Sequence, residues 1–446
     1  MTSPERPDRR LAPAELRDAR TALAAARGRQ RLDLILEARD PQALVRALPA
    51  DELYLVIRDV GFQDAAGLVP LASVGQFKTL LDLDAWAGDH FEPAKALPWL
   101  RAARAGSLTD PKAASRWAAK LTGIDREVLY LTLRETLRVH DLEQDEDPEL
   151  ESTHFLRTPE NKFVVEFLVE GAEYSAVRGV VDDLYAEDPF AASRLMSSLR
   201  FELPSELEET ALRWRAGRLA DLGYPPLEEA LSWFARPPRT ASEPAPSGAP
   251  ARPGGFLLAE LDKGTLLDRA VAALEPDPKD AVHAELVTAA NAVLVANRVD
   301  PGDPERVREA LSEARGLVEL GLDLRARAAS GSAADDVRVA AAALAEVPLK
   351  RIFQEGFGRL LELRWRAEKV LAVDGAPEKL GSPLAEAVAA LKPKRPRYFP
   401  GLEAPREEWG TPMSGAFEPR PFRTPEELRR TTAALDEAER KVGGAA

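Results

Sequence analysis

Apolar residues along this chain fall into short helical units, each of which begins or ends at a proline, glycine or serine. Four such units follow one another from Pro41 onward, reading PQALVRAL, PADELYLVIRDVG, FQDAAGLVPLA and SVGQFKTLLDLDAW. Helices of one to three turns are not stable alone, so they must stack on their neighbours. No segment shows the strict alternation, bounded by turn dipeptides, that indicates a strand. The pattern predicts an all-α chain whose N-terminal part is a superhelical or bundle-like stack of short helices.

Helix start signals favour the same class. Asp110–Pro111, Asp277–Pro278 and Asp303–Pro304 each place a capping oxygen before a proline suited to the first helical position. Ser73 and Gln76 have the spacing of a capping box, in which each side chain binds the other's backbone.

Two proline-rich stretches divide the chain. Residues 237–254 lie in PPRTASEPAPSGAPARPGG, whose low charge and missing apolar periodicity are typical of a linker. A second stretch, from Lys392 to Phe422, carries aromatic residues that favour packing on a surface. The sequence thus predicts an acidic N-terminal helical domain (1–236), a linker (237–254), a C-terminal helical domain (255–391) and an irregular segment that ends in a helix (392–446).

Charge and composition exclude several classes. The net charge is −14, most of it in residues 1–236, and an acidic surface disfavours nucleic acid as a partner. The chain has no cysteine, which removes disulfides and zinc–thiolate sites. No stretch has the roughly 18 uncharged apolar residues of a membrane helix, and the polar N-terminus has no signal-like apolar region. We expect a cytoplasmic, bacterial-type protein that is not inserted in a membrane.

Tryptophan stands beside arginine three times. LRWRA occurs at Leu212–Ala216 and again at Leu363–Ala367, and SRWAA at Ser115–Ala119 is a shorter echo. The tryptophans either close a core, with arginine stems along its rim, or form a stacking platform for single-stranded nucleic acid. Because both LRWRA motifs have an acidic residue at i,i+4 spacing, we predict buried core tryptophans. The flanking sequences agree too poorly to predict a duplication.

Carboxylates gather in LDLDAWAGDHFEP. Oxygen-rich clusters hold Mg²⁺ or Ca²⁺, and the candidate ligands here are Asp82, Asp84, Asp89, His90 and Glu92. The spacing does not match an EF-hand, so caps at a helix end and in a loop are the alternative. A second acidic stretch, HDLEQDEDPELESTH at His140–His154, is typical of a solvated loop, with a metal site between its histidines as the alternative.

One compact basic patch, KPKRPRYF, follows a predicted helix. Its prolines hold it extended, which favours docking on an acidic face of the N-terminal domain or of a protein partner. Cations that stabilise a helix end are the alternative. The candidate interaction residues are Lys392, Lys394, Arg395, Arg397, Tyr398 and Phe399.

Standard catalytic signatures are missing from the sequence. G-x-G-x-x-G, G-x-x-x-x-G-K-[ST], H-E-x-x-H and G-x-S-x-G do not occur. With four histidines and no cysteine, an enzyme would depend on carboxylates, and their spacing singles out none. We therefore expect no catalytic residue and no bound organic cofactor.

Two resemblances bear on function. ALVRALPADELYLVIRDV, within Pro41–Trp99, resembles the stacked helices of the cytosolic N-terminal module of MgtE-type magnesium transporters, which implies a response to divalent cations, although no membrane domain follows. Together with ELPSELEETALRWRAGRLADLGYPPLEEAL, it is similar over most of the chain to an uncharacterised family of soluble, all-helical bacterial proteins, which implies no activity. We predict a non-enzymatic scaffold or regulatory protein that binds a protein partner. A cation-responsive sensor is the alternative, and a carboxylate hydrolase is the least favoured.

Overall fold

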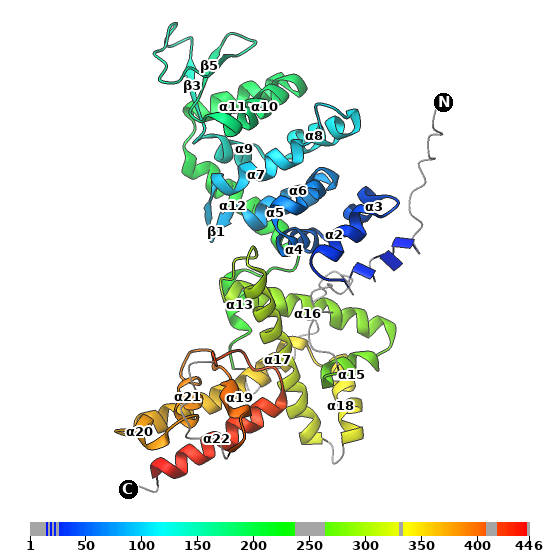
Figure 1. Cartoon of the computed structure of the whole chain (residues 1–446), viewed down its shortest axis with the longest axis vertical. Helices are drawn as coiled ribbons and strands as arrows, with labels where there is room; N and C mark the ends of the chain where they lie inside the picture. Colours follow the sequence, from blue (N-terminus) through cyan, green and yellow to red (C-terminus); the bar gives the residue numbers. More distant parts are fainter. Residues whose placement is uncertain are drawn as a thin grey trace. The chain divides into compact units, whose positions relative to one another are not determined.

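The computed structural model describes residues 15–16, 18–19, 22–23, 26–236, 264–329, 333–406 and 417–443. They form two units: the described residues up to Leu222 with Asp300–Pro304, and Gly223–Val299 with the described residues from Glu305 onward. Both units are mostly helical (Figure 1), which confirms the predicted class. The predicted linker, 237–254, lies outside the described residues.

Short helices follow one another through the first unit, and their caps explain where several begin. Ser73 and Gln76 make both bonds of the predicted capping box. Asp110 accepts hydrogen bonds from the first-turn N–H groups of Lys112 and Ala113, as predicted. The helices are α2 (Arg29–Leu36), α3 (Pro41–Ala47), α4 (Ala50–Val60), α5 (Phe62–Ala65), η1 (Ala66–Leu71), α6 (Val74–Asp84), α7 (Pro93–Arg104), α8 (Pro111–Gly123), α9 (Arg126–Leu133), α10 (Gly171–Glu187), α11 (Pro189–Phe201) and α12 (Pro204–Asp221).

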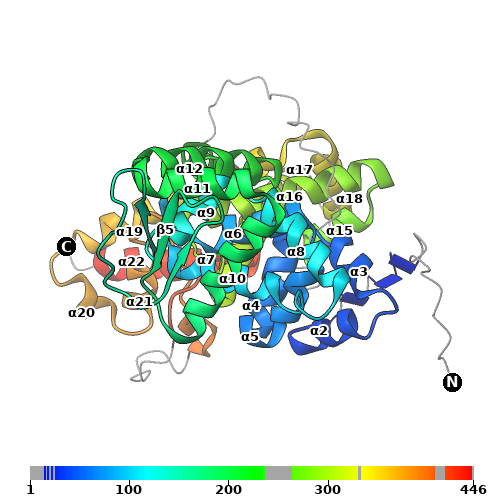
Figure 2. The ribbon, with the colours of Figure 1, turned by 90° about the horizontal axis from the view of Figure 1, so that it is seen from above.

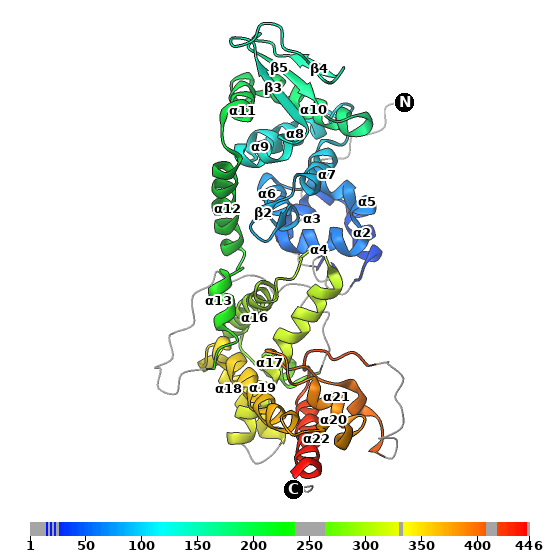
Figure 3. The same ribbon diagram turned by 90° about the vertical axis from the view of Figure 1, so that its left-hand side faces the viewer.

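A three-stranded antiparallel sheet lies between α9 and α10 in the sequence, where we predicted no strand. Its order is β3 (Leu137–Asp141), β5 (Phe163–Phe167), β4 (Phe155–Arg157), as Figure 3 shows. A shorter hairpin pairs β1 (Trp86–Ala87) with β2 (His90–Phe91). The expected absence of strands is therefore wrong, while the helical class holds for the rest of the unit.

The second unit begins before the predicted linker. Helix α13 (Leu227–Ser232) lies in the segment that the sequence assigned to the N-terminal domain, yet it packs against α16 (Pro276–Ala296) of the second unit. After it, Trp233 and Phe234 each meet the ring of Phe353 on α19 (Leu349–Leu371) edge-on, with centroids 5.3 Å apart. Residues 223–236 therefore belong to the second unit.

Long and short helices together form the second unit. Helices α19, α21 and α22 lie side by side (Figure 2). The prediction that Asp277 caps a helix is wrong, because α16 already begins at Pro276 and its N-cap residue is Glu275. The helices are α13 (Leu227–Ser232), α15 (Leu266–Ala272), α16 (Pro276–Ala296), α17 (Pro304–Ala329), α18 (Ala333–Glu346), α19 (Leu349–Leu371), α20 (Ala376–Leu380), α21 (Leu384–Ala389), η2 (Pro400–Glu403) and α22 (Pro425–Gly443). Within the described part of the chain, no helix is long and apolar enough to cross a membrane.

Candidate functional site

The first predicted metal ligand, Asp82, is buried in an ionic cluster on α6. The Arg218 guanidinium donates to it through Nε at 2.6 Å and Nη2 at 2.9 Å, and through Nη1 to Asp125 at 2.7 Å. Lys78 also donates to Asp125, at 2.7 Å. Burial raises the pKa of Asp82, and Arg218 opposes that rise. Asp82 therefore joins α6 to α12 and is already paired with a cation.

Asp84 is held in a second buried cluster. Its carboxylate accepts the Tyr54 hydroxyl at 2.8 Å and the Trp99 indole N–H at 2.7 Å, and the Arg58 guanidinium lies 3.4 Å away. Burial beside this carboxylate raises the pKa of Tyr54 well above its ordinary range, so the phenol stays a proton donor. The oxygens of Asp84 are thus occupied by core donors.

The other three predicted ligands lie in or beside the β1–β2 hairpin. Asp89 and His90 are exposed, His90 Nδ1 lies 2.9 Å from a Glu208 oxygen, and Glu92 pairs with Lys95 at 2.6 Å. The structure does not bring the five predicted ligands together. Over the described ranges, no group of three or more acidic, histidine or cysteine side chains converges as a metal site would require.

The acidic stretch His140–His154 forms the connection between β3 and β4. The buried Glu166 carboxylate on β5 accepts the backbone N–H groups of Glu151 at 2.6 Å and Ser152 at 2.7 Å, and lies 2.9 Å from His140 Nε2. Burial acts to raise the pKa of Glu166, but these hydrogen bonds outweigh it and hold the pKa below its ordinary value. The Glu166 carboxylate therefore helps to anchor the stretch to the sheet.

Several residues of the predicted basic patch already make contacts within the second unit. Arg395 lies over the Phe234 ring, 3.9 Å from its centroid, and donates to the Ala296 carbonyl at 2.9 Å. Arg397 pairs with Glu309. Tyr398 and Phe399, the predicted anchors for a partner, are themselves buried. Of the six candidate interaction residues, Lys392 and Lys394 are the exposed ones.

The prediction of buried tryptophans is wrong for both LRWRA motifs. Trp214 is 59% exposed and Trp365 is 44% exposed. Helix α12 instead turns two of its arginines inward: Arg215 donates to the Asp82 carbonyl at 2.8 Å, while Arg218 binds the Asp82 side chain. These short-range polar contacts fix the orientation of the helix and leave Trp214 outside. In the SRWAA echo, Trp117 is buried as predicted.

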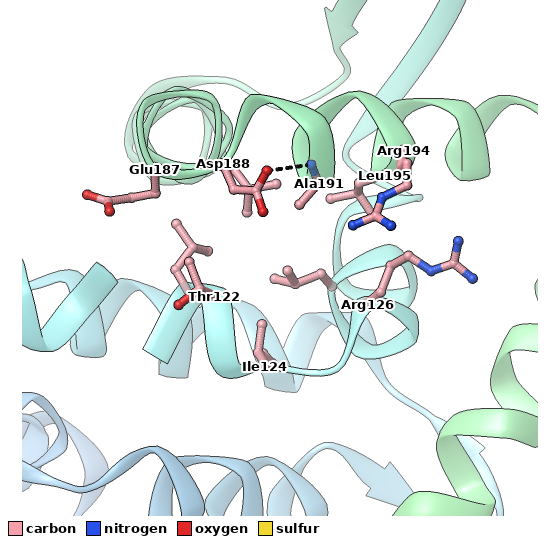
Figure 4. A pocket seen from close by; sticks show the side chains of 11 residues that line it. Thr122, Ile124, Arg126, Glu187, Asp188, Ala191, Arg194 and Leu195 are labelled. Carbon is pink, nitrogen blue, oxygen red and sulfur yellow. Dashed lines mark hydrogen bonds between the residues drawn. The ribbon is translucent and has the colours of Figure 1, made fainter. Parts of the chain in front are cut away.

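A pocket of about 230 Å³ opens between the α8–α9 turn and the α10–α11 turn of the first unit (Figure 4). We call it the α8–α11 groove. Short turns create it, since Asp188 alone separates α10 from α11 and caps α11 through the Ala191 N–H at 2.9 Å. Its apolar lining is Leu121, Ile124, Leu129, Leu184, Ala191 and Leu195, and its polar lining is Thr122, Arg126, Glu187, Asp188 and Arg194.

Some polar side chains of the groove already have partners within the protein, and others do not. Arg126 donates to Glu202 and to Ser198, each at 3.1 Å. Glu187 and Arg194 are exposed, and neither has an ion-pair partner within the described part of the chain. The lining contains no histidine or cysteine, and its hydroxyl, on Thr122, donates to the Ala118 carbonyl at 2.9 Å. The groove offers apolar surface and two unused charges, without a nucleophile beside a base.

Sequence reasoning did not find the groove. Asp188–Pro189 is the same cap-and-proline signal that we used at Asp110, Asp277 and Asp303, so the start of α11 was open to prediction. Nothing in the sequence indicates that this turn faces the α8–α9 turn. That juxtaposition depends on the packing of α8 and α9 against α10 and α11.

The chain belongs to the Family of unknown function (DUF6178), whose model matches residues 8–443. This confirms the predicted membership of an uncharacterised helical family. Among curated proteins and among solved structures, the chain has no match. The resemblance of Pro41–Trp99 to the transporter module stays a prediction.

Proposed function

We propose that this member of a family of unknown function is a non-enzymatic interaction protein, which holds a short segment of a partner protein in the α8–α11 groove. The observation that carries the proposal is the lining of the groove: an apolar floor, open at the surface, with unused charges on its rim. Recognition of short segments commonly uses this combination, in which the apolar contact gives affinity and the charges give specificity.

The apolar floor supplies the driving force. Leu121, Ile124 and Leu195 are already mostly buried within the first unit, so they are fixed in place before a partner arrives. A preformed surface of this kind loses little conformational entropy on binding. Covering one large apolar side chain of a partner in the groove would contribute about 1.5 to 3 kcal/mol.

Filling the groove tests the proposal. Thr122→Trp places a large ring at the mouth of the groove from an exposed position, without altering the buried floor. Peptides are selected from a displayed random library on the full-length wild-type protein, and their binding is measured by fluorescence anisotropy. They should bind the wild-type protein and fail to bind Thr122→Trp.

Thr210→Trp is the matched control. Thr210 is a helical threonine of the same unit that donates to the carbonyl four residues before it, as Thr122 does, and it does not line the groove. It should leave peptide binding unchanged, and circular dichroism should show that both variants are folded. Selected peptides that bind Thr122→Trp as tightly as wild type would place the binding surface elsewhere and defeat the proposal.

A further inference from the structure

Charges on the rim of the α8–α11 groove are separated by sign. Glu187 and Asp188 lie together at the α10–α11 junction, and Arg126 and Arg194 lie toward the other side of the pocket (Figure 4). The apolar floor runs between the two pairs. The groove therefore has an acidic end and a basic end.

At each end of the groove, one of the two charged side chains already has a structural role, and the other makes no ion pair among the described residues. Asp188 is committed as the cap of α11, and Arg126 is committed to Glu202 and Ser198. Glu187 and Arg194 are the members of each pair without an ion-pair partner among the described residues. An apolar strip separates this exposed carboxylate from this exposed guanidinium. The arrangement fits a ligand that spans the strip and forms an ion pair at each end.

We infer that the α8–α11 groove selects partner segments whose apolar core is flanked by one basic and one acidic side chain. The Lys or Arg of the segment meets Glu187, one or more large apolar side chains lie on the floor, and the Asp or Glu meets Arg194. This inference rests on the proposed function and adds to it the chemistry of the partner. Charge complementarity is the argument for this occupant over a purely apolar one.

The size of the effect follows from exposure. Ion pairs between exposed groups contribute little each, so the charges select between apolar segments and do not set overall affinity. A segment with two basic or two acidic flanks replaces one attractive pair by a like-charge contact. We expect a segment with one base and one acid to bind about fivefold more tightly than a segment whose two flanks have the same sign, equivalent to about 1 kcal/mol.

Single charge reversals on the full-length protein test the inference. Glu187→Arg makes both ends of the groove basic, and Arg194→Glu makes both ends acidic. The matched controls are Glu209→Arg and Arg213→Glu, which reverse the members of a largely exposed i,i+4 pair on α12 outside the groove lining. Displayed libraries of random short peptides are selected on wild type and on all four variants, and the charges that flank the apolar core of each selected pool are compared.

On wild type and on both α12 controls we expect flanks of opposite sign, in either order along the peptide, with about fivefold preference in anisotropy titrations. On Glu187→Arg we expect two acidic flanks, and on Arg194→Glu two basic flanks. Pools that bind, are blocked by Thr122→Trp and show the same flanking charges on all the proteins overturn the inference while the proposed function stands. Pools unaffected by Thr122→Trp overturn both. Circular dichroism on each variant confirms that the protein is folded.

Discussion

Trp214 and Trp99 should respond very differently to truncation, because one ring lies outside the core and the other inside it. Trp214 is 59% exposed, so Trp214→Ala should change the free energy of unfolding by less than about 1 kcal/mol. Trp99 is fully buried, stacks on Tyr54 and donates to Asp84, so Trp99→Ala should cost about 3 to 5 kcal/mol. Urea unfolding of both variants measures the difference. A loss at Trp214 as large as at Trp99 would contradict the outward placement.

Arg218 should matter most at neutral pH, because its main partner is a buried carboxylate. Arg218→Met leaves Asp82 buried without its cation, which should cost about 3 to 5 kcal/mol at pH 7. Burial already raises the pKa of Asp82 in the folded protein, and losing Arg218 raises it further. A carboxyl group with a raised folded pKa stabilises the fold only while protonated, and that stability is lost as the pH rises through the folded pKa.

The deficit of Arg218→Met relative to wild type should therefore shrink as the pH falls from 7 toward the ordinary range of an aspartate. Urea unfolding at a series of pH values measures it. Arg213→Met, at the largely exposed position of the same motif, should have little effect at any pH. A deficit independent of pH would mean that Asp82 stays ionised and that Arg218 acts through Asp125.

At the scale of elements, the second unit depends on a helix crossing made by glycines. A Cβ atom on Gly321 of α17 would overlap the Ile352 carbonyl oxygen, and one on Gly356 of α19 would overlap the Leu317 carbonyl oxygen. Gly321→Ala or Gly356→Ala should destabilise by about 1 to 3 kcal/mol or more, because two backbones must separate. Gly358→Ala, on α19 with open space around it, should stabilise by about 0.5 to 1 kcal/mol. Thermal unfolding that ranks all three variants alike would show that the crossing is not tight.

The helices were predictable from the sequence and the three-stranded sheet was not, for reasons visible in its strands. β3 alternates between buried and more exposed positions, as a half-covered strand should, but it is only five residues long. β5 is buried throughout, Glu166 included, so it shows no period of two. A long acidic connection, and not a turn dipeptide, joins β3 to β4. The strand signal was therefore weak in two strands and its usual boundary was missing.

At the scale of the whole molecule, composition led us to predict a linker at 237–254, but it did not indicate which residues belong to which of the two units. The linker prediction depended on proline and low charge, which say nothing about where the preceding residues pack. Trp233 and Phe234 are apolar and lie just before that stretch, so from the sequence they could pack in the core of either predicted domain. Contacts with α16 and α19, which are distant in sequence, decided the outcome.

The last prediction concerns separately produced fragments 1–236 and 255–446. The sequence predicts that the basic patch docks on the first fragment, through a contact that salt weakens unless Tyr398 and Phe399 anchor it. In the structure, α13, Trp233 and Phe234 of the first fragment pack against helices of the second, and aromatic burial is not screened by salt. The fragments should therefore associate at low salt and stay associated at high salt in analytical ultracentrifugation.

Two variants of the fragment pair separate the apolar contact from the charges. Trp233→Ala with Phe234→Ala should abolish association at every salt concentration, because it removes the rings that meet Phe353. Lys392→Ser with Lys394→Ser should change it little, since both side chains are exposed. Arg395→Ser should weaken it moderately by removing the cation over Phe234. Wild-type fragments that separate on raising the salt would show that charge, and not the aromatic cluster, holds residues 223–236 in place.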